Sequence, residues 1–242
     1  MFADFSDKIY DNFIKDDRWQ YLTKGLGTTL LITLFAIIIG IILGFIIATI
    51  RSSTDKLSES SQARRSIGFY ILKFFNWLCK VYLTVIRGTP VAVQLMIIYF
   101  VIFQSMDIDK VFVAVIAFGL NSAAYVAEIV RSGIMSIDRG QTEAGRSLGL
   151  SYVQTTIYII MPQAFKNILP ALANEFIVLL KETSVAGFIG LMDLTKGGDI
   201  IRSLTYEAFL PLIAIALIYL ILVMILTKLV SILERRLRNS DH

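Results

Sequence analysis

The stretch DRGQTEAGRSLGLSYVQTTIYIIMPQAF, residues 138–165, has the capping pattern of two short consecutive helices. Asp138 can cap the amino terminus of a first helix, with Gln141 at the reciprocal position of a capping box. Ser151 and Gln154 repeat this arrangement at the start of a second helix. The sequence therefore predicts a helical hairpin in this stretch.

Glycine and proline mark the ends of these two helices. Gly149 can end the first helix, because glycine adopts a left-handed backbone conformation without steric cost. Pro162 is expected to interrupt the second helix, since proline lacks the backbone N–H that an inner helical turn requires. Ala144 and Gly145 form a small-residue face that permits a close fit against another surface. An ordinary cytoplasmic hairpin would explain the caps equally well, so the pattern predicts a shape and leaves the role open.

The sequence around the hairpin is strongly apolar. Hydrophobic residues make up 56% of the 242-residue chain and charged residues 17%, and the mean hydropathy is +0.70. These values lie outside the usual range of soluble globular domains. The chain is therefore expected to be an all-α integral membrane protein.

The residues needed for most catalytic and metal sites are scarce. Cys79 is the single cysteine and His242 the single histidine, so neither a His/Cys metal site nor a His-based catalytic triad can be built. The phosphate-binding pattern G-x-x-x-x-G-K-[ST] does not occur. We therefore expect no catalytic residue, metal or cofactor in this chain, and any ATP-derived energy has to arrive from another polypeptide.

Apolar runs of roughly bilayer-spanning length recur along the chain. They predict about five transmembrane helices, at residues 26–50, 81–103, 111–130, 165–191 and 208–230. In the first run, small residues recur every four positions, which allows close helix packing within the chain or at a subunit interface. These small residues are Ala36, Gly40, Gly44 and Ala48.

The distribution of Lys and Arg predicts the orientation, because cytoplasmic flanks are enriched in these residues. We expect an extracytoplasmic amino-terminal segment (1–24), a transmembrane domain (25–235) and a cytoplasmic tail (236–242). Within the domain, 51–80 is predicted to be a cytoplasmic linker and 138–162 a cytoplasmic loop that contains the hairpin. The first segment is acidic and lacks the pattern of a cleavable signal peptide.

The hairpin resembles the EAA signature of ABC importer permeases, written EAA, three residues, G, nine residues, I, one residue, LP. The matching residues are Glu143, Ala144, Gly145, Gly149, Ile159, Met161 and Pro162. Gly145 replaces the second Ala and Met161 replaces Leu, and both changes are small. Three more segments are similar to those of the polar amino-acid uptake subfamily, which includes permeases for histidine, glutamine, arginine and cystine: YLTVIRGTPVAVQLMIIYF (82–100), NSAAYVAEIVRSGI (121–134) and NEFIVLLKETSVAGFIG (174–190).

This resemblance implies a type I ABC importer transmembrane fold in the bacterial plasma (inner) membrane. It implies a second permease subunit, a pair of ABC ATPase subunits that bind ATP and Mg, and an extracellular or periplasmic amino-acid-binding protein. It also implies that the EAA loop docks into the ATPase and that this chain is a transport subunit, with ATP hydrolysis supplied by its partner. The docking residues expected on this basis are Glu143, Ala144, Gly145, Arg146, Gly149 and Pro162.

Polar residues at membrane depth are candidates for the substrate pathway, because such groups are costly unless they face protein, water or ligand. An amino acid brings both an ammonium and a carboxylate, which amide, hydroxyl and charged groups can bind. Glu128 has the alternative of a structural ion pair with Arg131. The pathway candidates are Gln94, Asn121, Ser122, Tyr125, Glu128, Glu182, Thr183 and Ser184.

The segment Arg87-Gly88-Thr89-Pro90 is predicted to be a hinge or gate, since Pro90 can begin or kink a helix and Gly88 permits a turn. Direct contact with the ligand is the alternative for this segment.

A stand-alone secondary transporter or channel for a small polar solute is the rival function. A secondary transporter would need its own ion-coupling site and usually repeated halves, and no repeat is evident. The acidic residues Glu128, Glu175 and Glu182 favour a cationic or zwitterionic substrate over an anionic one. The sequence leaves open which amino acid is carried and whether the permease forms a homodimer or a heterodimer with a homologous subunit.

Overall fold

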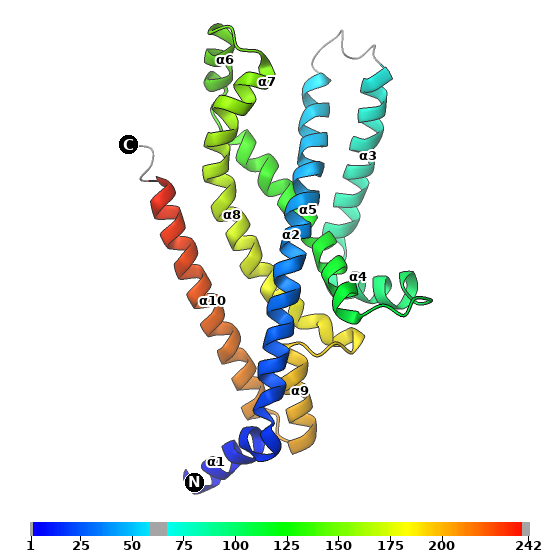
Figure 1. Cartoon of the computed structure of the whole chain (residues 1–242), viewed down its shortest axis with the longest axis vertical. Helices are drawn as coiled ribbons and strands as arrows, with labels where there is room; N and C mark the ends of the chain where they lie inside the picture. The colour runs from blue at the N-terminus through cyan, green and yellow to red at the C-terminus, as the bar shows by residue number, and fades with distance from the viewer. Residues whose placement is uncertain (1, 59–66, 239–242) are drawn as a thin grey trace. The chain divides into compact units, whose positions relative to one another are not determined.

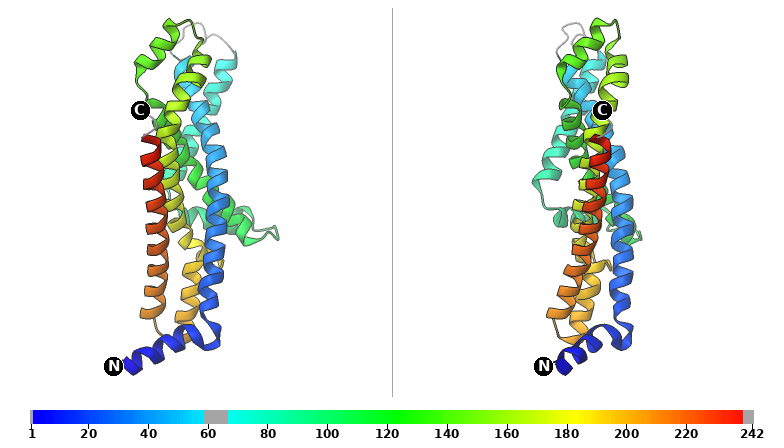
Figure 2. Two further views of the ribbon diagram at one scale, coloured as in Figure 1. Left: turned by 60° about the vertical axis from the view of Figure 1, so that its left-hand side comes forward. Right: turned by 90° about the vertical axis from the view of Figure 1, so that its left-hand side faces the viewer.

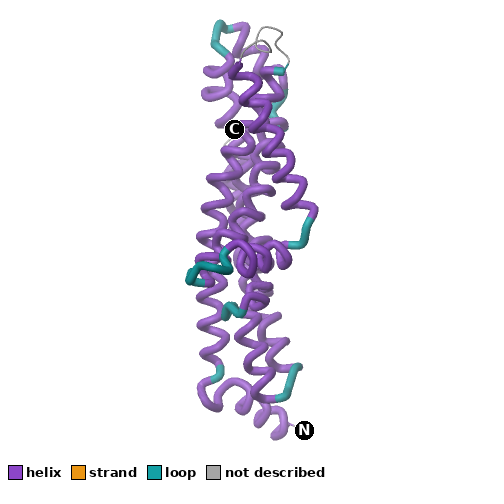
Figure 3. Tube along the Cα trace, turned by 90° about the vertical axis from the view of Figure 1, so that its right-hand side faces the viewer, coloured by secondary structure: helices purple, strands orange, loops and turns teal. Residues whose placement is uncertain are grey.

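The computed structural model describes residues 2–58 and 67–238, and within these ranges the regular structure is helical throughout (Figure 3). Short loops join the helices. The α-helices are α1 (Phe2–Ile9), α2 (Trp19–Leu57), α3 (Ile67–Gly88), α4 (Val91–Ile97), α5 (Lys110–Met135), α6 (Arg139–Ser147), α7 (Tyr152–Thr155), α8 (Met161–Glu182), α9 (Leu194–Thr205) and α10 (Phe209–Arg238).

Five shorter helical segments continue or connect these helices. Three of them are π-helical: η1 (Tyr10–Ile14), η4 (Ile98–Ile102) and η5 (Thr156–Ile160). The other two are 3₁₀ helices, η2 (Lys15–Asp17) and η6 (Thr183–Ile189).

Four helices of the described chain are long and apolar enough to cross a membrane: α2, α3, α5 and α10. The sequence predicted about five. The predicted spans 26–50, 111–130 and 208–230 lie largely or wholly inside α2, α5 and α10. The predicted span 165–191 does not form one helix, because α8 ends at Glu182 and η6 follows. α8 has 22 residues, but unlike the other four helices it is not apolar enough to count as a membrane-spanning helix.

The region between the first and second predicted spans differs most from the expectation. Residues 51–57 of the predicted linker continue α2, and residues 67–80 belong to α3. The predicted span 81–103 is broken after Gly88, where α3 ends and α4 begins beyond Pro90. Polar side chains in this part of α3 concealed the helix in the sequence. Of the rest of the predicted linker, Ser58 lies in a turn after α2, and 59–66 lie outside the described residues.

The chain divides into two compact units, each described by itself. The first unit contains the described parts of Met1–Ile38, Pro90–Gly119 and Phe176–Lys228. Its buried cluster joins Leu22 of α2 to Leu194 and Ile201 of α9 and Ile215 of α10. Gly197 of α9 brings that helix against the backbone of α2, where a Cβ atom would clash with Tyr21. Close backbone packing of this kind suits helices in lipid, where apolar burial alone gives little association energy.

Polar contacts tie the amino-terminal segment to the first unit. Asn12 of η1 is 1% exposed, and its side chain accepts a hydrogen bond from Thr205 Oγ1 at 3.0 Å and donates to Glu207 at 3.3 Å. Figure 2 shows α1 running sideways from the start of α2. The segment before the first span is thus anchored to the connection between α9 and α10.

The second unit contains the described parts of Ile39–Thr89, Leu120–Glu175 and Leu229–His242. Here the small-residue ridge of α2 packs against α5. A Cβ atom on Gly40 would approach Ser122 Oγ to 2.8 Å, and one on Gly44 would approach Val126 Cγ1 to 2.5 Å. In this part of the ridge, packing within one chain is therefore the observed use of the glycines.

A second cluster joins α3 to α5 in this unit. Leu83 of α3 packs with Ala124 and Ala127 of α5, and Ile47 of α2 covers them. The Tyr82 hydroxyl donates a hydrogen bond to the Leu120 carbonyl. The α6–α7 hairpin lies at the end of this unit, where α5 finishes and α8 begins (Figure 1).

Candidate functional site

Backbone caps define the α6–α7 hairpin. The Asp138 side chain accepts a hydrogen bond from Gly140 N at 2.7 Å, so the predicted cap is present. The reciprocal contact from Gln141 is not formed, and only the start of α7 has a full capping box. There Ser151 Oγ accepts from Gln154 N at 3.2 Å, and Gln154 Oε1 accepts from Ser151 N at 2.8 Å.

The turn between the two helices is a Schellman motif. Gly149 has φ +84°, a left-handed conformation that favours glycine. Its N–H donates to Arg146 O at 3.0 Å, and Leu150 N donates to Gly145 O at 3.2 Å. These two bonds satisfy carbonyls that would otherwise be unpaired at the end of α6. The predicted glycine turn is confirmed.

Pro162 does not interrupt the second helix. The chain stays helical from α7 through η5 into α8, and Pro162 is the second residue of α8. The π-helical η5 immediately before it has i→i+5 bonding, which absorbs the hydrogen bond that proline cannot make. A helix running through this proline gives a continuous connection from the hairpin into α8.

Gly145 faces inward and not toward another surface. It is buried, and a Cβ atom there would meet Thr155 Cγ2 at 2.6 Å and Ile159 Cδ1 at 3.0 Å. The small-residue face predicted for partner contact therefore packs, at Gly145, within the hairpin. Ala144, Glu143 and Arg146 are exposed, and the last two form no ion pair with each other.

The hairpin exposes apolar side chains that the sequence analysis did not single out. Leu148, at the turn, is 81% exposed, and Val153 of α7 is 63% exposed. Two exposed charged residues, Glu143 and Arg146, lie on α6 just before the turn. An apolar tip with a charged rim is the usual composition of a protein interface. The exposure of Leu148 could have been expected from its position in the sequence, because it lies in a tight turn that cannot bury its side chain.

One contact links the hairpin to the end of α2. The Lys56 ammonium lies over the Tyr152 ring, 2.7 Å from its centroid. Lys56 is in the last turn of α2 and Tyr152 is the first residue of α7. This cation–π contact connects the start of the second hairpin helix to the first span.

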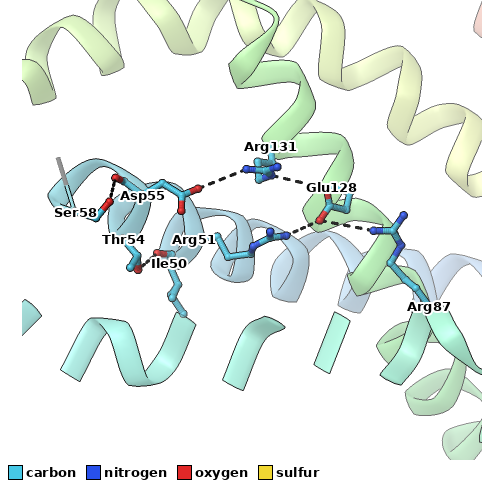
Figure 4. A network of polar contacts seen from close by, with 8 residues as sticks. All are labelled: Ile50, Arg51, Thr54, Asp55, Ser58, Arg87, Glu128 and Arg131. Atoms are coloured by element: carbon cyan, nitrogen blue, oxygen red, sulfur yellow. Dashed lines mark hydrogen bonds and ion pairs between the residues drawn. The ribbon is translucent and has the colours of Figure 1, made fainter. Parts of the chain in front are cut away.

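Glu128 is the centre of an ionic cluster that we call the Glu128 cluster, composed of Arg51, Asp55, Arg87, Glu128 and Arg131 (Figure 4). Glu128 Oε1 lies 2.5 Å from Arg51 Nη1 and 3.7 Å from Arg87 Nη1. Its other oxygen is 3.8 Å from Arg131 Nε, which matches the ion pair considered as the alternative for Glu128. Arg131 also reaches Asp55 at 3.5 Å.

The members of the Glu128 cluster differ in exposure. The Arg51 side chain is 15% exposed, whereas that of Arg87 is 47% exposed. Arg51 therefore makes the short, enclosed contact and Arg87 the long, accessible one. A cavity of about 500 Å³ adjoins them, lined by Arg51, Lys80, Leu83, Thr84, Arg87, Gly88 and Glu128.

The other predicted pathway residues of the second unit are buried or partly buried. Ser122 Oγ donates to Glu175 Oε1 at 2.9 Å, and both residues are buried. Asn121 is 3% exposed. The Tyr125 ring lies 5.9 Å from the Arg87 guanidinium, at the edge of cation–π range. The structure thus brings Tyr125 and Glu128 together at Arg87 and pairs Ser122 with Glu175.

The remaining pathway candidates belong to the first unit. Gln94 of α4 is 8% exposed, and Thr183 of η6 is fully buried. Thr183 Oγ1 donates to Leu180 O at 2.8 Å, so this hydroxyl caps the end of α8. Glu182 and Ser184 are partly buried beside it.

The segment Arg87-Gly88-Thr89-Pro90 lies where the sequence analysis placed a hinge. α3 ends at Gly88, and Pro90 has the extended backbone conformation of a helix N-cap, with φ −65° and ψ 135°. Thr89 Oγ1 donates to Val85 O at 2.8 Å. The predicted break between two helices is therefore present, and gating by it stays a prediction.

Comparison with known proteins places this architecture in a family. The model of the binding-protein-dependent transport system inner membrane component matches residues 60–239. The arginine transport system permease protein ArtQ of Bacillus subtilis (strain 168) is 40% identical over 223 residues, which are 91% of this chain and 94% of that relative. The chain belongs to the family of binding-protein-dependent transport system inner membrane components. The expected family is thus confirmed, and the chain is a permease subunit of the ABC transporter type.

Solved structures agree with the fold of this permease. A chain in the crystal structure of an amino acid ABC transporter with histidines is 44% identical, with a TM-score of 0.78 over 90% of this chain and 94% of that chain. A chain of the MetNI methionine ABC transporter, only 18% identical, has the same fold, with a TM-score of 0.71 over 92% of this chain and 99% of that one. The permease therefore has the predicted all-α type I ABC importer fold, and it is a multi-pass inner-membrane protein.

Proposed function

We propose that the permease forms the translocation pathway of an ATP-driven importer for a polar amino acid and is driven by a separate ABC ATPase through its α6–α7 hairpin. ATP and Mg bind to that ATPase, and this chain supplies no catalytic group. The exposed apolar tip of the hairpin carries the proposal: Leu148 is 81% exposed between two capped helices. A rigid element with an apolar tip and a charged rim fits insertion into a groove on another subunit.

The structure of the hairpin allows it to transmit movement. Its caps and Schellman turn fix the two helices, so displacement of the tip moves the whole element. It continues without a break into α8, and the Lys56–Tyr152 contact joins it to α2. ATP-driven closure of the partner subunits would then shift helices between two arrangements, inward-facing and outward-facing.

The proposed orientation places the hairpin and the carboxyl terminus in the cytoplasm, because the Lys- and Arg-rich flanks lie on that side. The amino-terminal segment then lies outside the membrane, on the face where a substrate-binding protein delivers its ligand. A second copy of the permease completes the pathway, since a symmetric homodimer is the default assembly for such a subunit.

An amino acid substrate fits the names of the relatives and the charges of the second unit. The relatives include transport proteins named for arginine and for glutamine. The cavity beside the Glu128 cluster has a carboxylate and three basic side chains on its wall, which suits a solute that has both an ammonium and a carboxylate. Because Glu128 is offset by Arg51, Arg87 and Arg131, it no longer argues for a cationic substrate over a neutral zwitterion.

The test is uptake of labelled amino acids into proteoliposomes that contain the permease, its ATPase and the binding protein. Uptake of at least one polar amino acid should require all three components and ATP. Robust uptake by the permease alone, without ATP, would instead establish the rival function of a stand-alone transporter or channel.

A further inference from the structure

A small polar cavity lies between the last turns of α2 and the part of α3 that runs from Phe69 to Lys80. Its volume is about 380 Å³, and it is lined by Thr54, Asp55, Ser58, Phe69, Lys73, Asn76 and Lys80. Lys73, Asn76 and Lys80 are spaced three and four residues apart, so they share one face of α3. Lys80 also lines the cavity beside the Glu128 cluster, whereas Lys73 and Asn76 belong neither to that cavity nor to the docking hairpin.

The two lysines on the cavity wall carry charge that no residue of the described ranges 2–58 and 67–238 neutralises. Lys73 and Lys80 are both exposed, and neither side chain has an ion-pair or hydrogen-bond partner in the described part of the chain. Asp55, the carboxylate on the same wall, lies 3.5 Å from Arg131. Within the part of the chain that the structure describes, two cationic donors therefore line the cavity without a paired anion.

Asn76 adds a buried acceptor to the same cavity. The residue is 6% exposed, and its side-chain oxygen has no hydrogen-bond partner among the described residues. A buried polar atom without a partner costs free energy, and such atoms are rare in folded proteins unless a ligand or water completes them. The cavity thus offers two donors for an anion and one acceptor for a hydroxyl group.

The outer face of α3 shows where such a ligand would come from. Ile71, Phe74 and Trp77 are each more than half exposed on a helix that is long and apolar enough to span the membrane. These side chains suit contact with acyl chains, and tryptophan is favoured near the headgroup region. A ligand that combines an anionic headgroup with acyl chains would bind the polar face of α3 through its headgroup and the apolar face through its chains.

We propose that this cavity binds the headgroup of an anionic glycerophospholipid, namely phosphatidylglycerol. Its phosphate accepts hydrogen bonds from Lys73 and Lys80, and a glycerol hydroxyl donates to the Asn76 oxygen. Its acyl chains lie along the exposed apolar face of α3. Basic pockets at the ends of spanning helices are favourable sites for anionic lipid headgroups. Phosphatidylethanolamine would bring an additional cation next to the two lysines and is therefore disfavoured.

Lipid binding can be measured by native mass spectrometry of the full-length permease, purified in detergent and titrated with phosphatidylglycerol, phosphatidylethanolamine or phosphatidic acid. Wild type should retain phosphatidylglycerol in preference to phosphatidylethanolamine. The double variant Lys73→Gln/Lys80→Gln should retain about tenfold less, because each basic residue contributes separately to anionic lipid binding. Lys73→Arg/Lys80→Arg should keep binding, which separates loss of the site from loss of the fold.

A matched control is Lys24→Gln/Lys228→Gln, which removes the same charge from two exposed lysines on α2 and α10 and should leave retention unchanged. Asn76→Leu should lower the preference for phosphatidylglycerol over phosphatidic acid, which lacks the glycerol hydroxyls. Equal retention by the Lys73/Lys80 variant and the control would overturn the proposal. Equal binding of phosphatidylethanolamine, or displacement of the lipid by inorganic phosphate alone, would overturn it too.

Discussion

The α6–α7 hairpin and the Glu128 cluster are two polar regions of the second unit, and they are held together in opposite ways. Bonds between residues three to five apart hold the hairpin, which presents Leu148 to the outside. The Glu128 cluster joins residues up to 77 positions apart on three helices. It keeps Arg51 enclosed and Arg87 accessible.

This difference suits two tasks in a transporter. A docking element has to keep its shape while another subunit pushes on it, and local caps give it that rigidity. Helices that change their arrangement need contacts that can be exchanged, and an ion pair at 3.7 Å with a half-exposed arginine is weakly held. We therefore assign force transmission to the hairpin and rearrangement to the Glu128 cluster, and the four substitutions below test this division.

The largest effect is expected for Leu148→Asp. A charge at the exposed apolar tip should weaken retention of the ATPase by at least about thirtyfold, as expected for loss of an interface hot spot worth about 2 kcal/mol. Retention is measured by affinity purification of the complex from membranes. Leu204→Asp introduces the same change at a leucine of α9 that is 51% exposed, and it should retain the ATPase fully. Equal losses of ATPase retention in both variants would contradict a specific role of the hairpin in docking.

Gly149→Val should have the next largest effect. A β-branched residue at φ +84° is strained by about 1–2 kcal/mol, and the tip would lose its orientation without losing its chemistry. Transport should fall, and ATP hydrolysis should become less dependent on substrate delivery, while the amount of permease in the membrane stays unchanged. Wild-type coupling of hydrolysis to transport in this variant would show that the turn geometry is dispensable.

Arg51→Gln should mainly affect stability. Glu128 would lose its 2.5 Å partner and keep Arg87 and Arg131, so the cost is about 1–2 kcal/mol for a pair that is only partly buried. The corresponding fall in Tm is about 2–8 °C, measured from tryptophan fluorescence of the purified permease. The loss in Arg51→Gln/Glu128→Gln should be smaller than the sum of the losses in the two single variants. A loss in the double variant equal to the sum of the two single losses would contradict the pairing.

Arg87→Gln should have the smallest effect on stability and a selective effect on transport. The side chain is 47% exposed and 3.7 Å from Glu128, so Tm should stay within about 1 °C of wild type. Because Arg87 lines the cavity next to Glu128, the KM for amino acid uptake should rise. An unchanged KM together with a lowered Tm would assign Arg87 a structural role only.

The contrast between local and long-range contacts also explains which features could be predicted from the sequence. Asp138, Gly149 and the Ser151–Gln154 box act on neighbouring residues, so their spacing predicted the hairpin correctly. The partners of Glu128 depend on how three helices pack, and spacing on one helix could indicate only Arg131. Arg51 is far away in sequence and was therefore missed as its nearest partner.

Some of the predicted helix boundaries were wrong for a related reason. Lys73, Asn76 and Lys80 made the first half of α3 look like a linker, because hydropathy averages over all faces of a helix. In the structure they share one face, and apolar side chains cover the rest. Similarly, Gly145 suggested a surface for a partner, whereas its neighbours Thr155 and Ile159 come from within the hairpin.

Cross-linking from the hairpin tip tests the central claim most directly. Cys79 is buried, so Leu148→Cys provides one accessible thiol for a maleimide photo-cross-linker in membranes that contain the co-expressed ATPase. The account predicts a covalent permease–ATPase product from position 148 and none from Leu204→Cys on α9. Absence of the product at position 148, or equal products at both positions, would contradict the assignment of the hairpin as the docking element.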